Sequence, residues 1–586
     1  MNKKLTATLL VLLVFAMLLT ACGPQQPVQT EKPADDTKKT DVTETPQREE
    51  VTLRFFFGYN PGLAPKNWWT EILRKDLGIR LDYIAEDTEM ATMIATHELP
   101  DLLYINKPVY LKELIDADML ICLEDHLDKI PNAINNNTDE FIQFKREMFP
   151  DKKIYAIPDG TTDKVDSVGS FEYGMRVHIP YFNEYVEEKG LPTLNKLRDF
   201  LPILKYMQDK HPVNADGQSA YAFGFFGGWS QPTPGAFMLE AMTSMFITPC
   251  VFIEINSEDM SYKPIWADDS RLKEVVDFVF EANQMGILDP DMYNMTFADW
   301  LTKLASERLL SYPTYSPSDK DPYHVIPFKE TKAEDFTFPW KIGNSGGNSG
   351  LYLGKPGKNL DRALEFVNYM TDPDNYLMMA LGPKGVGWDV NDKGEPYLTP
   401  TFRKWQEGDT SADLEGGSNP FKTTFMHASS QGTTNWRPLF RVTHPALGGA
   451  FIDPNTWPLQ EGQTKTETQL IYEDLMHRMF GAEIDPRHPL TATMLYNQKG
   501  FYAKPTNYLL QGPEVFGEEI ASKIRALPDK KLINQAVLAK NAEERDSLWK
   551  EWSELMQNTA KQEGLTPDLI FELYKKEYDK VNAYFK

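Results

Sequence analysis

The chain has 586 residues, and its 85 acidic residues outnumber its 61 basic residues, which gives a net charge of −24. Binding to nucleic acid depends on Lys and Arg side chains that neutralise phosphates, so this acidic excess argues against nucleic acid as a partner. Hydrophobic residues make up 41% of the chain and aromatic residues 12%, which is enough apolar material for more than one domain at this length.

The first residues have the pattern of an export signal. Lys3 and Lys4 precede an apolar run at 9–19, which is about half of the ~20 apolar residues that span a bilayer. The run ends in Leu-Thr-Ala-Cys at 19–22, which resembles the lipobox of bacterial lipoproteins. That resemblance implies cleavage before Cys22, a diacylglycerol on its sulfur, and a protein anchored at the outer face of the cell membrane. The alternative is an ordinary secretory signal followed by a chance cysteine.

The next segment, 23–50, is predicted to be a disordered linker. It is rich in Pro, Thr, Gln and charged residues, it has no aromatic residue, and its only large apolar residues are two valines. Such a segment buries too little apolar surface to offset the entropy lost on ordering.

From residue 51 the pattern predicts an α/β fold. The expected elements alternate as strand, helix, strand, helix and strand, at 51–57, 66–76, 79–84, 89–100 and 101–106. Gly78 ends the first helix. Alternation of this kind predicts a mostly parallel sheet with helices on its faces, whose ligands bind beyond the carboxyl ends of the strands. Tyr59 and Asn106 follow two of those ends and are candidate ligand-binding residues.

The remaining elements are mostly helical. A strand is expected at 174–182, a helix that passes into a strand at 297–313, and a buried strand at 350–354. Helices are expected at 193–210, at 268–290 with Gly286 as a stop, as a pair over 359–382, and at 544–557 and 569–585. The segment after Trp388 is irregular.

Four stretches resemble the extracellular solute-binding proteins of family 1, the large lipid-anchored sugar-binding type found in Gram-positive bacteria. They are the lipobox and the segments LPDLLYIN (99–106), EANQMGILDPD (281–291) and RALEFVNYMTDPDNYLMMALGPKGVGWDVNDKGEPYLT (362–399). The resemblance covers most of the chain from about residue 50 to about residue 400.

This resemblance implies a two-lobe periplasmic-binding-protein fold of type II, with a central cleft and hinge crossovers. Lobe one would comprise 51–165 and 335–383, and lobe two 166–334 and 384–586. The family captures a solute by hinge closure and delivers it to the permease subunits of an ABC importer. It also implies a protein that acts as a monomer, without a cofactor.

Enzyme and metal motifs fail in their context. Gly343, Ser345 and Gly347 match the spacing of a G-x-S-x-G nucleophile elbow, but a glycine-rich loop rather than a helix follows them. Asn214 and Asp216 sit like calcium ligands in a loop, but the first position would be Pro212 and the last Phe223. Neither of these two can supply the carboxylate that an EF-hand loop has there, so a plain turn is expected and no metal is assigned.

Besides Cys22, the chain has only Cys122 and Cys250. They are able to pair in an oxidising compartment or to remain buried thiols, and two cysteines are too few for a zinc cage.

Aromatic residues in loops are the remaining candidates for a ligand site. A sugar ring stacks its C–H face on an aromatic ring, while its hydroxyls need polar partners, so a sugar site combines the two kinds of side chain. Candidates besides Tyr59 and Asn106 are Trp229, Tyr315, Trp340, Trp388, Trp436 and Arg437. Any single aromatic residue of the group has core or surface packing as its alternative role. Trp229 leads the group, because glycines and Pro232 flank it.

The leading hypothesis is therefore the binding lipoprotein of an ABC importer for an oligosaccharide. A receptor for a peptide or another non-sugar solute, and a surface carbohydrate-active enzyme, are the alternatives. The failed enzyme motifs separate the first hypothesis from the enzyme, but they do not separate it from the peptide receptor.

Overall fold

A computed structural model describes most of the chain after the linker. The described residues are 48–56, 68–84, 88–105, 108–147, 149, 151–158, 174–226, 242, 249–250, 252–255, 260–292, 294–313, 322–330, 350–355, 357–381, 384–400, 402, 439, 444, 465–481, 518–528 and 531–584. The helices and strands all belong to the compact unit Glu49–Lys586.

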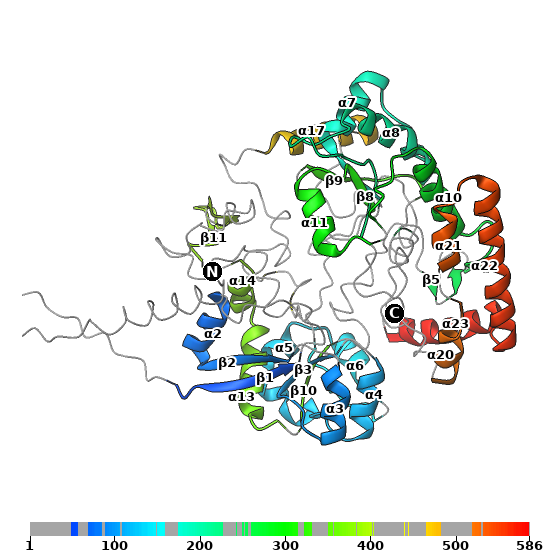
Figure 1. Cartoon of the computed structure of the whole chain (residues 1–586). Helices are drawn as coiled ribbons and strands as arrows, with labels where there is room; N and C mark the ends of the chain where they lie inside the picture. Colours follow the sequence, from blue (N-terminus) through cyan, green and yellow to red (C-terminus); the bar gives the residue numbers. More distant parts are fainter. Residues whose placement is uncertain are drawn as a thin grey trace, which may run out of the picture. The chain divides into compact units, whose positions relative to one another are not determined.

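The first sheet has four strands in the order β10-β3-β1-β2 (Figure 1). Its strands are β1 (Val51–Phe56), β2 (Ile79–Ile84), β3 (Leu102–Ile105) and β10 (Gly350–Leu353). β1 pairs in parallel with both β2 and β3, and β10 is antiparallel to β3. The predicted strand–helix alternation is confirmed here, and Gly78 ends α2 with a positive φ of 66°.

Helices cover both faces of the first sheet (Figure 1). Leu53, Phe55 and Leu102 point to one face and Phe56 and Leu103 to the other, because side chains alternate along a strand. The helices around this sheet are α2 (Trp68–Leu77), α3 (Thr88–Thr96), α4 (Pro108–Asp116), η1 (Leu123–Lys129), α5 (Pro131–Asn135), α6 (Asp139–Glu147), α13 (Leu360–Met370) and α14 (Pro373–Leu381). Side chains of α3 and α4 join Phe56 on one face, whereas those of α2, α13 and α14 join Phe55 on the other.

The second sheet has the order β8-β4-β9 and is antiparallel. Its strands are β4 (Met175–His178), β8 (Ser311–Pro313) and β9 (Tyr323–Ile326). A strand was expected over 174–182, but the chain turns at Ile179 into α7 (Ile179–Lys189), with Pro180 in its first turn. Proline has no N–H to donate and its φ suits a helix start, so it is tolerated there.

The other elements pack with the second sheet in one hydrophobic cluster. They are η3 (Leu197–Phe200), α8 (Leu201–Lys210), α10 (Arg271–Gln284), α11 (Phe297–Ala305), the three-stranded sheet β5 (Pro249–Cys250), β6 (Ile253–Ile255) and β7 (Tyr262–Pro264), and α17 (Glu467–Phe480), α20 (Glu518–Arg525), α21 (Lys531–Ala536), α22 (Ala542–Gln562) and α23 (Pro567–Tyr584).

The C-terminal helices belong to this core. Trp549 and Trp552 of α22 are 2% and 1% exposed, and the Trp549 indole N–H donates to Asp268 at 3.0 Å. Arg545 lies over the ring of Phe280 in α10, at 4.7 Å from its centroid. Burial of this kind gives α22 a structural role in the core of the second sheet.

Three residues that were predicted to lie in lobe two pack with the first sheet. The lobe boundaries remain a prediction. The clusters of the first sheet include Trp388, Phe402 and Leu439, although the sequence puts 384–586 in lobe two. Trp388 lies in a hairpin of β11 (Trp388–Val390) and β12 (Pro396–Leu398). The short connection from α14 keeps this hairpin beside the first sheet, where its apolar side chains are buried.

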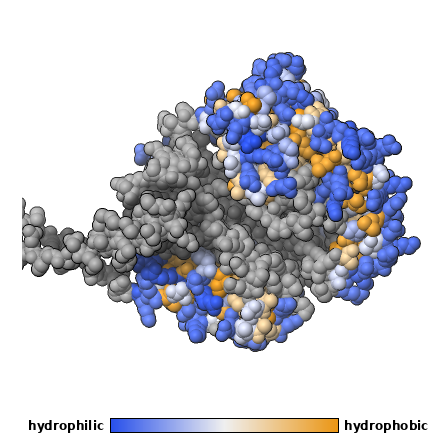
Figure 2. Space-filling model, in the orientation of Figure 1, coloured by the Kyte–Doolittle hydropathy of each residue, from blue (hydrophilic) through white to orange (hydrophobic). Residues whose placement is uncertain are grey.

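The described surface is largely hydrophilic over α7 and α22, in keeping with the acidic composition (Figure 2). Large apolar side chains are exposed at scattered positions, such as Leu470 in α17 and Leu555 in α22. No helix among the described residues is long and apolar enough to cross a membrane.

The aspartate of the LPDLLYIN segment, Asp101, has a structural role at the start of β3. Its buried carboxylate accepts hydrogen bonds from the backbone N–H of Arg54 at 2.9 Å and of Asn359 at 3.3 Å. Arg54 lies in β1 where β3 has not yet begun, so the carboxylate replaces the missing strand partner. Gly354, which follows β10, leaves room for the same turn, since a Cβ there would lie 2.2 Å from the carbonyl oxygen of Pro100.

Replacing Asp101 by Ala should lower the free energy of unfolding by about 2–4 kcal/mol, because buried N–H groups of β1 and α13 lose their acceptor. Urea unfolding measures the change. The control is Asp361→Ala, which removes an 81% exposed carboxylate paired with Lys129 and should change the free energy of unfolding far less, because exposed ion pairs stabilise little. Equal losses in the two variants would contradict the role given to Asp101.

Candidate functional site

Two short segments extend the second sheet beyond β8. Residues 221–226 run parallel to the chain at 308–311: Leu310 N–H donates to the Tyr221 carbonyl at 2.9 Å, and Gly224 N–H donates to the Ser311 carbonyl at 3.4 Å. Residues 287–289 run parallel on the other side, where Asp289 N–H donates to the Phe223 carbonyl at 2.8 Å. Gly224 allows close packing here, because a Cβ at this position would lie 2.6 Å from a methyl group of Leu309 and 3.0 Å from the Cβ of Asp289.

The parallel arrangement brings three segment ends to one edge of the second sheet. Residues 221–226, 287–289 and β8 run in the same direction, so Phe226, Asp289 and Pro313 mark neighbouring carboxyl ends. Two of the predicted ligand-binding residues follow these ends in the sequence, Trp229 after Phe226 and Tyr315 after Pro313. Both lie outside the described residues. The edge from which they depart is the kind of edge at which ligands bind in open α/β sheets.

The first sheet has a matching edge. Phe56, the last residue of β1, pairs with Leu103 in the parallel ladder, and β3 continues in the same direction to Ile105, so the carboxyl ends of both strands face the same edge. Tyr59 follows the end of β1 and Asn106 the end of β3, and both lie outside the described residues.

Trp388 lies in the core. It is 6% exposed, it belongs to the hydrophobic cluster of β1 and α13, and the Lys384 ammonium lies 5.9 Å from the centroid of its ring. So little of the indole surface is exposed that its main role is packing. Trp388 was expected in a loop, and it lies at the start of β11 in the hairpin β11–β12.

The remaining candidates lie outside the described residues: Trp340, Trp436, Arg437 and the lipidation site Cys22. The glycine-rich stretch around Ser345 lies outside them as well. Cys122 has a free thiol.

The loop at Asn214 has the geometry of a turn. The Asn214 side-chain oxygen accepts hydrogen bonds from the backbone N–H groups of Asp216 and Gln218, at 3.1 and 2.8 Å. Gly217 has a positive φ of 75°. The oxygen that would serve as a calcium ligand is thus used by the loop itself. Among the described residues no group of three or more His, Cys, Asp or Glu side chains is placed to hold a metal ion.

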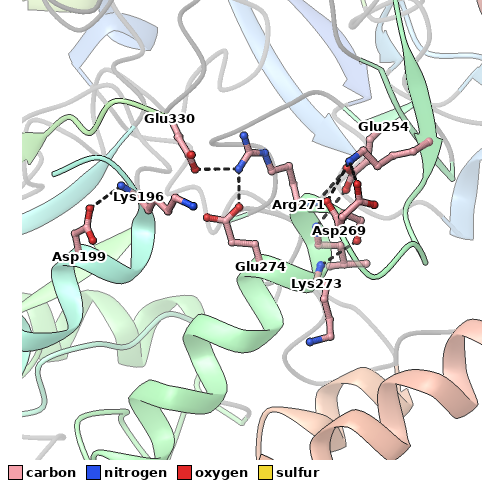
Figure 3. Close-up of polar contacts among 11 residues, drawn as sticks. Lys196, Asp199, Glu254, Asp269, Arg271, Lys273, Glu274 and Glu330 are labelled. Carbon is pink, nitrogen blue, oxygen red and sulfur yellow. Dashed lines mark hydrogen bonds and ion pairs between the residues drawn. The ribbon is translucent and has the colours of Figure 1, made fainter.

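A buried carboxyl group fixes the helix that leads to this edge. Glu254 of β6 is 4% exposed and accepts hydrogen bonds from the N–H groups of Arg271 and Leu272, at the start of α10 (Figure 3). The Arg271 guanidinium bridges Glu274 at 2.6 Å and Glu330 at 3.0 Å. α10 ends at Gln284, and the segment 287–289 follows it closely. The contacts of Glu254 and Arg271 at the start of α10 fix the helix and so help to place 287–289.

Burial raises the pKa of Glu254 to about 7, although the two backbone N–H groups act in the opposite direction. The unfolded chain ionises this carboxyl near pH 4.5, so the stability of the folded state should fall as the pH rises from 4.5 through about 7. The upper bound of this contribution is about 3 kcal/mol.

We expect Glu254→Gln to flatten this pH dependence, because the amide does not ionise. Urea unfolding at pH 5 and pH 8 measures the difference for the wild type and the variant. Glu274→Gln, on the same helix, is the control and should keep the slope of the wild type. The assignment is wrong if Glu254→Gln keeps that slope as well.

Sequence reasoning missed the side chains that support this edge. Lys303 of α11 is buried with Asp289, and its ammonium lies 2.6 Å from the Asp289 carboxylate. Trp300 of the same helix is 4% exposed. The signal for Asp289 was present in the GILDPD segment, which was used only as a mark of resemblance. Trp300 lies in the helix expected at the start of 297–313, and it was given no role of its own.

Comparison with known proteins supports the same fold. No family model matches the chain. A curated relative, the fructooligosaccharide ABC transporter substrate-binding protein FusA of Streptococcus pneumoniae, is 22% identical over 344 residues, which is 56% of this chain. The match spans 61% of the length of that relative.

Solved structures match over more of the chain. FusA in complex with kestose has a TM-score of 0.57 at 14% identity and covers 91% of this chain and 100% of its own. A human-milk-oligosaccharide (HMO) binding, ABC-transporter-associated solute-binding protein of Bifidobacterium longum infantis has a TM-score of 0.55 at 16% identity, with 90% and 99% covered. The predicted α/β fold and the resemblance drawn from the sequence are confirmed: the chain has the fold of the extracellular solute-binding proteins that serve sugar ABC transporters.

Proposed function

We propose that this protein is the solute-binding lipoprotein of an ABC importer, and that it captures an oligosaccharide between its lobes and delivers it to membrane permeases. The observation that carries the proposal is the shared edge of the second sheet, from which the segments with Trp229 and Tyr315 both depart. The fold and the sugar-binding relatives support the choice of ligand class. Aromatic rings at such an edge suit the C–H face of a sugar.

The proposal is tested by binding and turnover together. The purified protein, without residues 1–22, should bind at least one member of a panel of plant and microbial oligosaccharides in calorimetry. Mass spectrometry after incubation should show every sugar intact, since the proposed protein is a receptor. Shortening of a sugar would favour the carbohydrate-active enzyme, and binding of peptides alone would favour the peptide receptor.

Cys22 is proposed as the mature N-terminus and the membrane anchor. Cys22→Ala should release the protein to the medium or leave it as an uncleaved precursor, because no sulfur remains to carry the diacylglycerol. Cell fractionation with an antibody to the body of the protein measures the distribution. A Cys22→Ala protein that is processed normally and stays with the membrane would exclude lipidation at this residue.

Trp229 is proposed as a ring that stacks on the sugar, and Trp388 offers a matched control. Trp229→Ala should weaken binding by about 2 kcal/mol, or roughly thirtyfold, with little change in melting temperature. Trp388→Ala should lower the melting temperature, because truncation of a core aromatic residue costs about 3–5 kcal/mol, and should leave affinity nearly unchanged. Calorimetry on both variants decides. The reverse result would exchange the roles of the two residues.

A further inference from the structure

A stack of three rings lies at the edge of the second sheet opposite to Pro313. His178 is the last residue of β4, and Met175 at the other end of that strand pairs with Pro313. The ring of Tyr181, in the first turn of α7, lies nearly parallel to the His178 ring, with 3.7 Å between the centroids. Its other face stacks on the ring of His211, which follows α8, at 3.5 Å. The stack therefore joins the sheet to two helices.

His178 is the inner ring of this stack, and its imidazole is enclosed. The side chain is only 4% exposed, and the ring of Tyr323 meets it edge-on at 5.6 Å. Within the described part of the chain, neither nitrogen of the His178 ring has a hydrogen-bond partner. Burial without a hydrogen bond is costly for a neutral imidazole and far more costly for an imidazolium. The closed stack therefore suits only the neutral form of His178.

The charged groups that face the stack offer little compensation for a proton on His178. The Glu307 carboxylate lies 3.5 Å from the Nε2 atom of His178, but its side chain is 45% exposed, so water screens the contact. The Glu184 carboxylate lies 2.8 Å from the Nε2 atom of His211 and is occupied there. The other titratable groups that face the ring are phenols whose pKa is raised by burial, so they stay neutral: Tyr181 and Tyr323.

The cost of protonation has a definite sign. Burial lowers the pKa of His178 to about 3, and the positive charge of His211 acts in the same direction, whereas the ordinary pKa of an imidazole in water is 6.5. The closed stack is therefore fully favoured above pH 6.5 and loses that advantage as the pH falls from 6.5 toward 3. Glu254 acts in the opposite sense, because its contribution is lost as the pH rises.

From this geometry we propose that His178 and the rings stacked on it form an acid-sensitive latch at this edge of the second sheet. While His178 is neutral, the three rings stay together and hold the first turn of α7 against the end of α8. When His178 takes up a proton, the stack opens locally, because the imidazolium reaches water only outside it. Opening frees the junction of β4 with α7 and the chain around His211. The latch needs no ligand and is independent of the proposed function.

Amide hydrogen exchange tests the latch on the ligand-free protein without residues 1–22. Wild type and His178→Phe are compared at pH 7 and at pH 5, so that intrinsic exchange rates cancel at each pH. Phenylalanine keeps a ring against Tyr181 but takes up no proton. In peptides that cover 176–186 and 208–214, the ratio of the wild-type rate to the variant rate should rise roughly twentyfold from pH 7 to pH 5, because an opened imidazole protonates near pH 6.5. His178→Gln, which also takes up no proton, replaces His178→Phe if the latter does not fold.

His211→Phe is the matched control. It keeps the outer ring of the stack, and the His211 side chain that it replaces is 24% exposed and already paired with Glu184. This variant should keep the acid response of the wild type. The comparison is repeated in the Glu254→Gln protein, in which the buried carboxyl group no longer titrates, and the same response is expected there.

Three results would overturn the latch. The first is an equal rate of exchange in wild type and in the variant at position 178, at both pH values. The second is loss of the acid response in His211→Phe, which would assign the titration to the outer ring. The third is acid-induced exchange spread evenly over all peptides of the second sheet, which would show general loss of stability instead of local opening at the stack.

Discussion

The parallel hydrogen bonds between 221–226 and its two neighbours are the constraint on which the candidate site depends. Phe223 holds Asp289 and Gly224 holds Ser311 through backbone bonds, which fixes the direction of all three segments. If the segment at 221–226 ran antiparallel, the stretch that follows Phe226 would leave at the opposite edge from the stretch that follows Pro313. The absence of a side chain at Gly224 and the buried pair of Lys303 and Asp289 both maintain this alignment. Loss of Lys303 would leave the fully buried Asp289 carboxylate without its cation, which is strongly destabilising.

In both sheets, side chains connect strand ends to a neighbouring helix, but the residues that do so differ. In the first sheet a side chain, the carboxylate of Asp101, replaces a missing strand partner and joins β1 to the start of α13. In the second sheet a helix, α11, covers three segment ends and joins them through one aromatic and one charged side chain. Each of these features lies in or beside a segment that marked the family resemblance, so part of that resemblance reflects contacts that build the fold.

Much of the fold was predictable from local pattern, and the site was not. The alternation of strands and helices over 51–105 follows from apolar spacing and from Gly78, which are local signals. The strand expected over 174–182 was wrong in its second half, because Pro180 suits the first turn of a helix as well as a break. The segment at 221–226 has no polar–apolar alternation, and its strand-like pairing depends on partners far away in the chain. For that reason Trp229 and Tyr315 were chosen separately, and their departure from one edge became visible only with the sheet. Trp388 was chosen from its expected place in a loop, whereas its burial depends on side chains of β1 and α13 that lie far away in the sequence.

The position of β1 has a mechanical consequence for a protein held by its amino end. β1 lies between β2 and β3, and the Glu50 carboxylate just before it is held by Arg74 at 2.9 Å and Arg80 at 2.8 Å. A pull on the chain before residue 50 therefore acts along the axis of an interior strand. Force in that direction loads the hydrogen bonds of both neighbouring ladders together, whereas a pull on an outer strand would open them one after another. If the chain is held at Cys22 as proposed, the folded part would resist unravelling from the point at which the force enters.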